Sequence, residues 1–258
     1  AFYCMKYEIT QGQYAAFLNA LTSVECGGQD NTGQTADRYY KPATLANRYS
    51  LTGFWPAITA GKPYVACNNL SWADDAAYAA WAGLRPMTEL EFEKACRGPI
   101  VPVAGEYAWG STAISQATGI SNDGAVNETA SNSGANCAYG NHGSVQGPLR
   151  AGVFATSTSD RAGSGASYWG IMELSGNLWE RVVTIGNGTG QGFQGTHGAG
   201  TLTLPADWPQ ANAVGAGFRG GSWDSAATGA RVSDRASAAS TWAARDSHEG
   251  SRGVRAAP

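Results

Sequence analysis

Residues 217–258 read GFRGGSW, then DSAATGARVSDRASAASTWAARDSHE, then GSRGVRAAP. The two ends combine Gly with Phe, Trp, Val and Arg, and we expect short strands at residues 218–223 and 253–255. The middle is mainly Ala, Ser, Asp, Thr and Gly, and its only large apolar residues are Val232 and Trp242. Such a run buries little apolar surface. The rest of the chain must therefore hold it in place.

The composition indicates a loop-rich fold that is stabilised by large buried aromatic side chains. The chain has 258 residues, compatible with one domain over residues 1–258, and it contains 35 Gly, 9 Trp and 11 Tyr. The net charge of −3 provides no field that attracts nucleic acid, so we expect no nucleic-acid partner. Apolar runs are far shorter than the ~20 residues of a membrane helix, so we expect no membrane span. No signal peptide is visible, and the compartment stays open.

The cysteines do not form a recognisable framework. Their number is odd and no CxxC pair occurs, which argues against a zinc ribbon or a dense set of disulfides. One or two bridges and buried free thiols both remain open. The five are Cys4, Cys26, Cys67, Cys96 and Cys137.

Three helices are predicted from N-cap signals, of which the first and third are capping boxes and the second is an N-cap Ser with Asp three residues later and Gly83 as the stop. The pairs are Thr10 with Gln13, Ser71 with Asp74, and Thr88 with Glu91. Strands are expected at residues 2–9 and 63–70. Residues 22–62, 99–168 and 186–200 are predicted to be loops. Three short helices followed by loops and short strands indicate the α+β class.

Six motifs then identify a family resemblance by their order. They are YEITQGQYAAFLNAL (7–21), NLSWADDAAYAAWAGLRPMTELEFEKACRG (69–98), YAWG (107–110), YWGIMELSGNLWERV (168–182), FRGGSW (218–223) and SRGVRAA (251–257). This order resembles that of formylglycine-generating enzyme (sulfatase-modifying factor) domains, nearly end to end. The resemblance implies a variant C-type lectin fold, which is α+β and loop-rich with short helices and strands.

The resemblance also locates where the family's oxidases hold copper. They use two cysteines between the RGGSW-type motif and the following Arg. Here that interval, residues 224–231, has no cysteine. A thiolate copper site needs thiolates, so we expect no copper, no formylglycine-generating activity and no catalytic residues. The related iron-dependent sulfoxide synthases need a cluster of His, whereas His142, His197 and His248 lie far apart.

The C-terminal run resembles the variable region of proteins that are diversified by retroelements. In these, reverse transcription errors opposite template adenines turn Asn codons into codons for Asp, Ser, Thr, Gly, Ala or His. The run is built mainly from that set, and no Asn follows Asn212. Our leading hypothesis is a receptor-type, ligand-binding protein with residues 217–258 as its variable region. Its ligand would be a macromolecule, protein or glycan, and display on a cell or virion surface is compatible with this role.

The hypothesis predicts which side chains contact the ligand. A rigid domain can present exchangeable side chains without unfolding. Trp and Arg are the usual interface anchors, which selects Trp223, Trp242 and Arg245 as fixed anchors. The predicted variable contacts are Asp224, Ser225, Ala227, Gly229, Asp234, Ala236, Ser237, Ala238, Ala239, Ser240, Asp246, Ser247 and His248.

A calcium site is the other expectation from the resemblance. The SGNLWE motif of the family binds calcium, which implies the carbonyls of Ser175 and Leu178 and the side chains of Asn177 and Glu180. Oxygen ligands suit a hard cation. The alternative is that Asn177 and Glu180 close a turn through hydrogen bonds.

Two other interpretations stay open. In one, the chain is an enzyme of the same family with oxidase or other chemistry. In the other, it is a structural subunit with a fixed partner. The acidic residues Glu89, Glu91 and Glu93 are expected to cap a helix or face solvent. Arg219, Arg252 and Arg255 are expected to brace the scaffold.

Overall fold

A mixed β-sheet lies at the centre of the computed structural model, which describes residues 1–27 and 38–258. Part of the loop expected at residues 22–62 lies outside the described residues. Within the described part, the sheet has the order β1-β10-β4-β7-β8, and β9 pairs with β7. Its strands are β1 (Phe2–Cys4), β4 (Arg85–Thr88), β7 (Trp179–Val183), β8 (Ala216–Arg219), β9 (Glu249–Gly250) and β10 (Gly253–Ala256).

Both ends of the C-terminal segment, residues 217–258, form strands of this sheet. β8 pairs antiparallel with β7, and β9 pairs parallel with the same strand. β10 then lies between β1 and β4, antiparallel to both. The expected strand at residues 253–255 is confirmed. The sheet is therefore what holds the core-poor run in place.

The three predicted helices are confirmed, each with its capping box. They are α1 (Gln11–Ala20), α3 (Trp72–Trp81) and α4 (Glu89–Arg97). Both α3 and α4 pack beside β4. Two four-residue helices were not predicted: α2 (Ser23–Cys26), which has its own capping box, and α5 (Gly188–Gln191), inside the expected loop at residues 186–200.

The strand predictions were partly wrong. β1 ends at Cys4 rather than at residue 9, and residues 63–70 form only isolated bridges to loops. β8 ends at Arg219, because Gly220 and Gly221 have φ of 90° and 72°, which an extended strand does not adopt. Residues 99–168 contain little regular structure, as expected. Two small hairpins complete the inventory: β2 (Leu51–Thr52) with β3 (Thr59–Ala60), and β5 (Ile120–Ser121) with β6 (Thr129–Ala130).

The interior is filled by aromatic and aliphatic side chains together with several buried arginines. Tyr14, Phe17 and Tyr78 form one aromatic cluster between α1 and α3. Cys67, Cys96 and Cys137 are buried free thiols, as in the second of the two possibilities, and Cys4 is a half-buried free thiol. No helix among the described residues is long and apolar enough to cross a membrane.

Candidate ligand-binding surface

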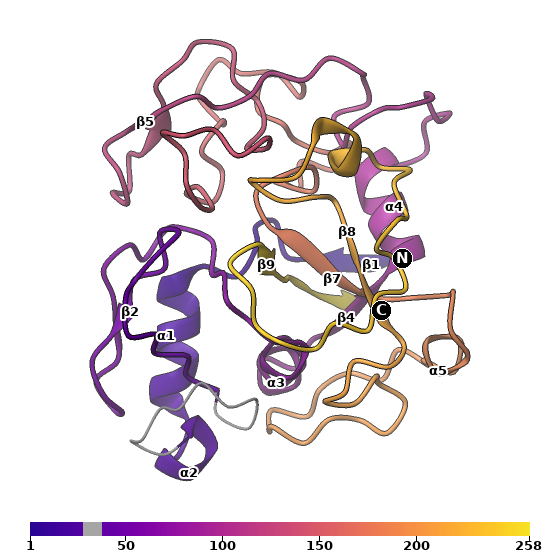
Figure 1. The fold of residues 1–258 in the computed structure, drawn as a ribbon. Helices are drawn as coiled ribbons and strands as arrows, with labels where there is room; N and C mark the ends of the chain where they lie inside the picture. The colour runs from indigo at the N-terminus through magenta and orange to yellow at the C-terminus, as the bar shows by residue number, and fades with distance from the viewer. Residues whose placement is uncertain (28–37) are drawn as a thin grey trace.

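The run from Asp224 to His248 is an irregular segment that leaves the sheet after β8 and returns to it at β9 (Figure 1). Within it the structure has one 3-10 turn, η1 (Ala227–Ala230). The segment lies directly on β8, since Phe218 N donates to Ser237 O at 2.9 Å. A Cβ placed on Gly217 would stand 1.8 Å from Ala238 O. The glycine is what allows this close backbone contact.

Buried ion pairs attach the segment to α4. Arg219 is fully buried and donates to Glu89 at 3.2 Å and to the carbonyl of Val232 at 2.6 Å. Arg235, which belongs to the run, donates to the same carboxylate at 2.9 Å. Burial alone would raise the pKa of Glu89, but hydrogen bonds from Arg235, Ile185 N and Thr184 hold this pKa below its usual range. Glu89 is thus a buried anchor, and the expectation of a solvated charge was wrong for it.

A second anchor joins the run to α3. Arg245 Nε donates to Asp74 at 2.9 Å, and Nη2 donates to the other oxygen at 3.1 Å. The same carboxylate closes the capping box of α3 by accepting from Ser71 N at 2.8 Å. The helix start and the C-terminal run therefore share one buried acid.

Arg181 on β7 forms a third anchor. Its guanidinium donates to the carbonyls of Trp242 and Ala244, both at 2.9 Å. It also pairs with Glu249 and lies 3.0 Å from Asp75. One buried cation thereby holds the backbone of the run against the sheet.

Most predicted contact positions have accessible side chains. Of the thirteen, Ala236 and Ala239 are exposed and ten are half-buried. Ala238 is the exception at 2% exposure, because its backbone presses against Gly217. The prediction that Ala238 contacts a ligand was wrong for this conformation.

The three predicted anchors do not share one role. Trp242 is 55% exposed and is available to a ligand. Trp223 is only 4% exposed, and its indole N–H donates to Ser247 O at 3.0 Å. The Arg245 side chain is buried on Asp74. Trp223 and Arg245 therefore support the surface from below, and Arg245 also lines a groove on it. Contact of either residue with a ligand stays a prediction.

His248 joins the two ends of the run. Its Nε2 lies 3.0 Å from Asp224, its Nδ1 pairs with Asp246, and its ring stacks on Trp223 with centroids 5.0 Å apart. The sequence analysis predicted that Trp223, Asp224, Asp246 and His248 belong to the ligand-binding surface, but it did not predict that they contact one another. The contact links the segment that follows β8 to the segment that precedes β9.

Two concavities lie along this surface. The first, a polar groove of about 360 Å³, is lined by Tyr40, Pro42, Thr44, Ala46, Asn47, Tyr49, Asn69, Arg245, Asp246, Ser247 and His248. The second, which we call the aromatic cup, has about 320 Å³ and is lined by Trp179, Phe218, Ser237, Ser240, Trp242 and Glu249. The sequence did not indicate that half-buried Trp179 and buried Glu249 line this cup.

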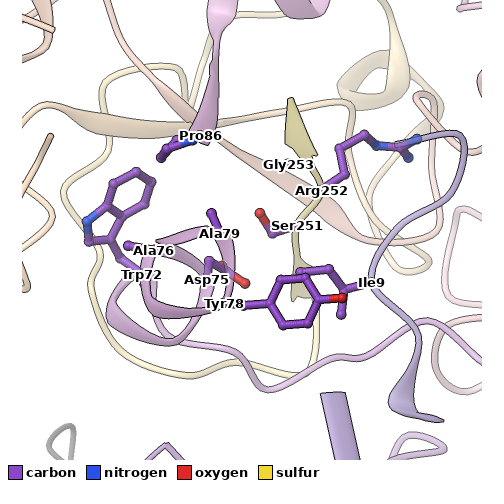
Figure 2. A pocket seen from close by; sticks show the side chains of 10 residues that line it. All are labelled: Ile9, Trp72, Asp75, Ala76, Tyr78, Ala79, Pro86, Ser251, Arg252 and Gly253. Atoms are coloured by element: carbon purple, nitrogen blue, oxygen red, sulfur yellow. The ribbon is translucent and has the colours of Figure 1, made fainter. Parts of the chain in front are cut away.

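Beside these anchors the interior contains a much smaller cavity. Between α3 and β10, a cavity of about 10 Å³ is lined by Asp75, Ser251 and their neighbours (Figure 2). This is room for about one water molecule. Neither carboxylate oxygen of Asp75 accepts a hydrogen bond. Burial raises the pKa of Asp75 well above its usual range, and Arg181 offsets part of this.

The residues of the expected calcium site are buried and engaged with the protein. Asn177 Oδ1 accepts from Leu149 N at 2.7 Å, and its amide nitrogen donates to Glu8. Glu180 accepts from Arg252 Nε at 2.6 Å, and Ser175 O accepts from the Cys137 thiol at 3.1 Å. Across residues 1–27 and 38–258, no three His, Cys, Asp or Glu side chains are grouped to hold a metal.

These contacts correspond to the turn-closing alternative. Leu178, also buried, donates its N–H to Glu8 at 3.0 Å. Calcium at residues 175–180 stays a prediction. Arg252 does brace the sheet, as expected, through Glu180 and the carbonyl of Met172 at 2.8 Å.

The whole length of the fold matches one family. The model of the sulfatase-modifying factor enzyme 1-like domain matches residues 1–257. The chain belongs to this family. The expected α+β fold of the formylglycine-generating-enzyme type is thereby confirmed.

Two further likenesses are more distant. Hercynine oxygenase of Mycolicibacterium smegmatis is 26% identical over 153 residues, which are 59% of this chain and 28% of that enzyme. The chain therefore matches less than a third of that protein's length. The solved structure of Treponema denticola variable protein 1 has 14% identity and a TM-score of 0.49, covering 98% of this chain and 84% of that one.

Proposed function

We propose that this domain is a ligand-binding protein whose C-terminal face is diversified by a retroelement to change its target. The observation that carries the proposal is the division within residues 224–248. Ala236, Ala239 and Ser240 are accessible and make no side-chain hydrogen bond within the described residues, while Arg235 and Arg245 tie the backbone to buried acids. Exchange of the small residues leaves these anchors in place.

The architecture suits a variable binding site for a physical reason. Contacts made by Arg181 are to carbonyls of the run, which are independent of side-chain identity. A substitution at Ser240 or Ala239 therefore changes the surface without removing a bond that holds the loop. Binding specificity then varies at little cost in stability, as a scaffold with exchangeable loops requires.

The first test is genomic. We expect a near-copy of the coding segment for residues 217–258 near the gene, together with a reverse transcriptase gene. Sequences from several isolates should differ within residues 224–248 at adenine positions of that copy. Absence of both the copy and the transcriptase gene would remove the diversification proposal, and identical isolates would favour a fixed-partner subunit.

The second test concerns the ligand. A library varied at the accessible positions, with Arg235 and Arg245 retained, should stay folded and should yield binders to different proteins or glycans. A matched library that varies only the opposite edge, at Tyr3 and neighbouring exposed positions, is the control. If the two libraries yield binders equally often, the C-terminal face has no special role.

An enzymatic role is the second candidate, favoured by the 26% identity to an oxygenase. The interval at residues 224–231 lacks the cysteines of the copper-dependent members. We therefore propose a non-catalytic domain. Turnover of a cysteine-containing peptide by purified, copper- or iron-loaded protein would reverse this choice.

A further inference from the structure

The floor of the aromatic cup is set by strand pairing. Trp179 of β7 is in register with Glu249 of β9, and Arg181 of β7 is in register with Phe218 of β8. Paired residues share a face of a sheet, and residues two apart on a strand do so too. These four side chains therefore project from the same face. Glu180 projects from the other, where it pairs with Arg252.

Three aromatic rings line the cup. The rings of Trp179 and Phe218 meet edge to face, with centroids 6.4 Å apart. Trp242 adds an exposed wall from the C-terminal run. Aromatic faces attract cations, and Trp does so most strongly. Phe218 already contacts one cation, since the guanidinium carbon of Arg181 lies 4.7 Å from its centroid.

The charge of the cup is incompletely balanced. Glu249 pairs with Arg181, but the same guanidinium lies 3.0 Å from Asp75, so one cation serves two carboxylates. Arg181 is buried beneath the cup, and the residues that line the cup include no basic side chain. Burial raises the pKa of Glu249 to about 8 in spite of Arg181, and the charge of Asp246 adds to this effect. A second positive charge at this carboxylate would stabilise its ionised form.

From this geometry we propose that the aromatic cup binds a basic side chain, Lys or Arg, of a protein ligand. The inference rests on the proposed function, because the predicted variable residues Ser237 and Ser240 form part of the cup wall. The rings provide cation–π contacts and the carboxylate provides a charge-assisted hydrogen bond. An anionic group would be repelled by Glu249 once that carboxyl is ionised. A sugar could stack on Trp242 but would bring no charge to balance the acid.

The experiment uses a blocked tripeptide, acetyl-Gly-Arg-Gly-amide, titrated into the protein by calorimetry and by NMR of the indole N–H groups. Its matched control replaces Arg with citrulline, which has nearly the same shape and no charge. We expect saturable binding of the Arg peptide and at least about tenfold weaker binding of the citrulline peptide. Equal affinity for the two, or no binding of the Arg peptide, overturns the inference. Tighter binding of a methyl glycoside than of the Arg peptide would assign the cup to glycans.

Variants locate the site. Trp242→Ala should lower the affinity for the Arg peptide roughly 2- to 30-fold, the range spanned by one cation–π contact. Trp169→Ala is the matched control, because Trp169 is similarly exposed, at 59%, and does not line the cup. Both changes affect exposed rings, so both proteins should stay folded. If Trp169→Ala weakens binding as much as Trp242→Ala, the peptide does not bind in the cup.

The result separates this inference from the proposed function. A template copy with a transcriptase gene, but no binding of the Arg peptide, would remove the cup assignment alone. Binding of the Arg peptide without a template copy would leave a fixed site for a basic ligand and would remove diversification.

Discussion

Arg219 and Arg235 contact the same carboxylate from different environments, and this makes their removal a direct test of how the C-terminal run is held. Both donate to Glu89. Arg219 is buried, whereas 48% of the Arg235 side chain is exposed. We consider Arg219→Met and Arg235→Met, which keep most of the aliphatic length and remove the charge.

The two substitutions should lower the free energy of unfolding by different amounts. Breaking a buried ion pair by removing one partner costs about 3–5 kcal/mol. Arg219 also donates to Glu93 at 2.9 Å and to Val232 O, while Glu89 retains Arg235, so we expect about 3 kcal/mol. An exposed ion pair contributes about 0–1 kcal/mol, so Arg235→Met should cost less than about 1 kcal/mol.

The assay is urea unfolding followed by tryptophan fluorescence and circular dichroism, with the free energy of unfolding extrapolated to water. Wild type and both variants are compared in the same buffer and salt. Equal losses for the two variants would show that Glu89 is not buried as described. A larger loss for Arg235→Met would refute the assignment of Arg219 as the main brace.

Three further predictions follow from other contacts. Gly217→Ala should destabilise the protein by about 1–3 kcal/mol in the same unfolding assay, because its Cβ meets Ala238 O, whereas Gly188→Ala, which has no neighbour within 4 Å, should be near neutral. Burial raises the pKa of Glu249 from 4.5 to about 8. The folded state therefore binds a proton more tightly than the unfolded state, and the resulting contribution to the free energy of unfolding is fully present below pH 4.5 and is lost as the pH rises through 8. Unfolding free energies measured across this window should fall with pH, and Glu249→Gln should flatten the slope; an unchanged slope contradicts the assignment. We also propose that calcium binds at residues 175–180. Chelation should then lower the Tm, and a Tm unaffected by both chelator and added calcium excludes the site.

The helices were predictable because their starting signals are local. A capping box places both hydrogen-bond partners within four residues, so Thr88 and Glu91 specify the start of α4 whatever surrounds them. The strands were harder, because pairing depends on distant segments. β9 has two residues, and its existence depends on β7, about seventy residues earlier. Nothing near Glu249 in sequence indicates that neighbour.

The candidate surface was predictable in its location but not in its depth. Composition alone predicted residues 224–248 to be replaceable, and twelve of the thirteen predicted contact positions are accessible. Composition did not show that Trp223 lies beneath the surface while Trp242 lies on it, because both are large rings in a small-residue context. Their roles depend on contacts with the sheet and with Ser247.

The anchors explain how a segment with almost no core of its own keeps one conformation. Glu89 and Asp74 are first-turn acids of α4 and α3, where the helix N-terminus favours negative charge. Each then accepts an arginine from the C-terminal run. The helix ends stabilise the acids, the acids hold the arginines, and the arginines fix the backbone on which the small side chains are displayed. Variation that retains Arg235 and Arg245 should therefore preserve the fold, whereas exchange of Arg245, whose charge is buried on Asp74, should release the loop and impair every ligand specificity at once.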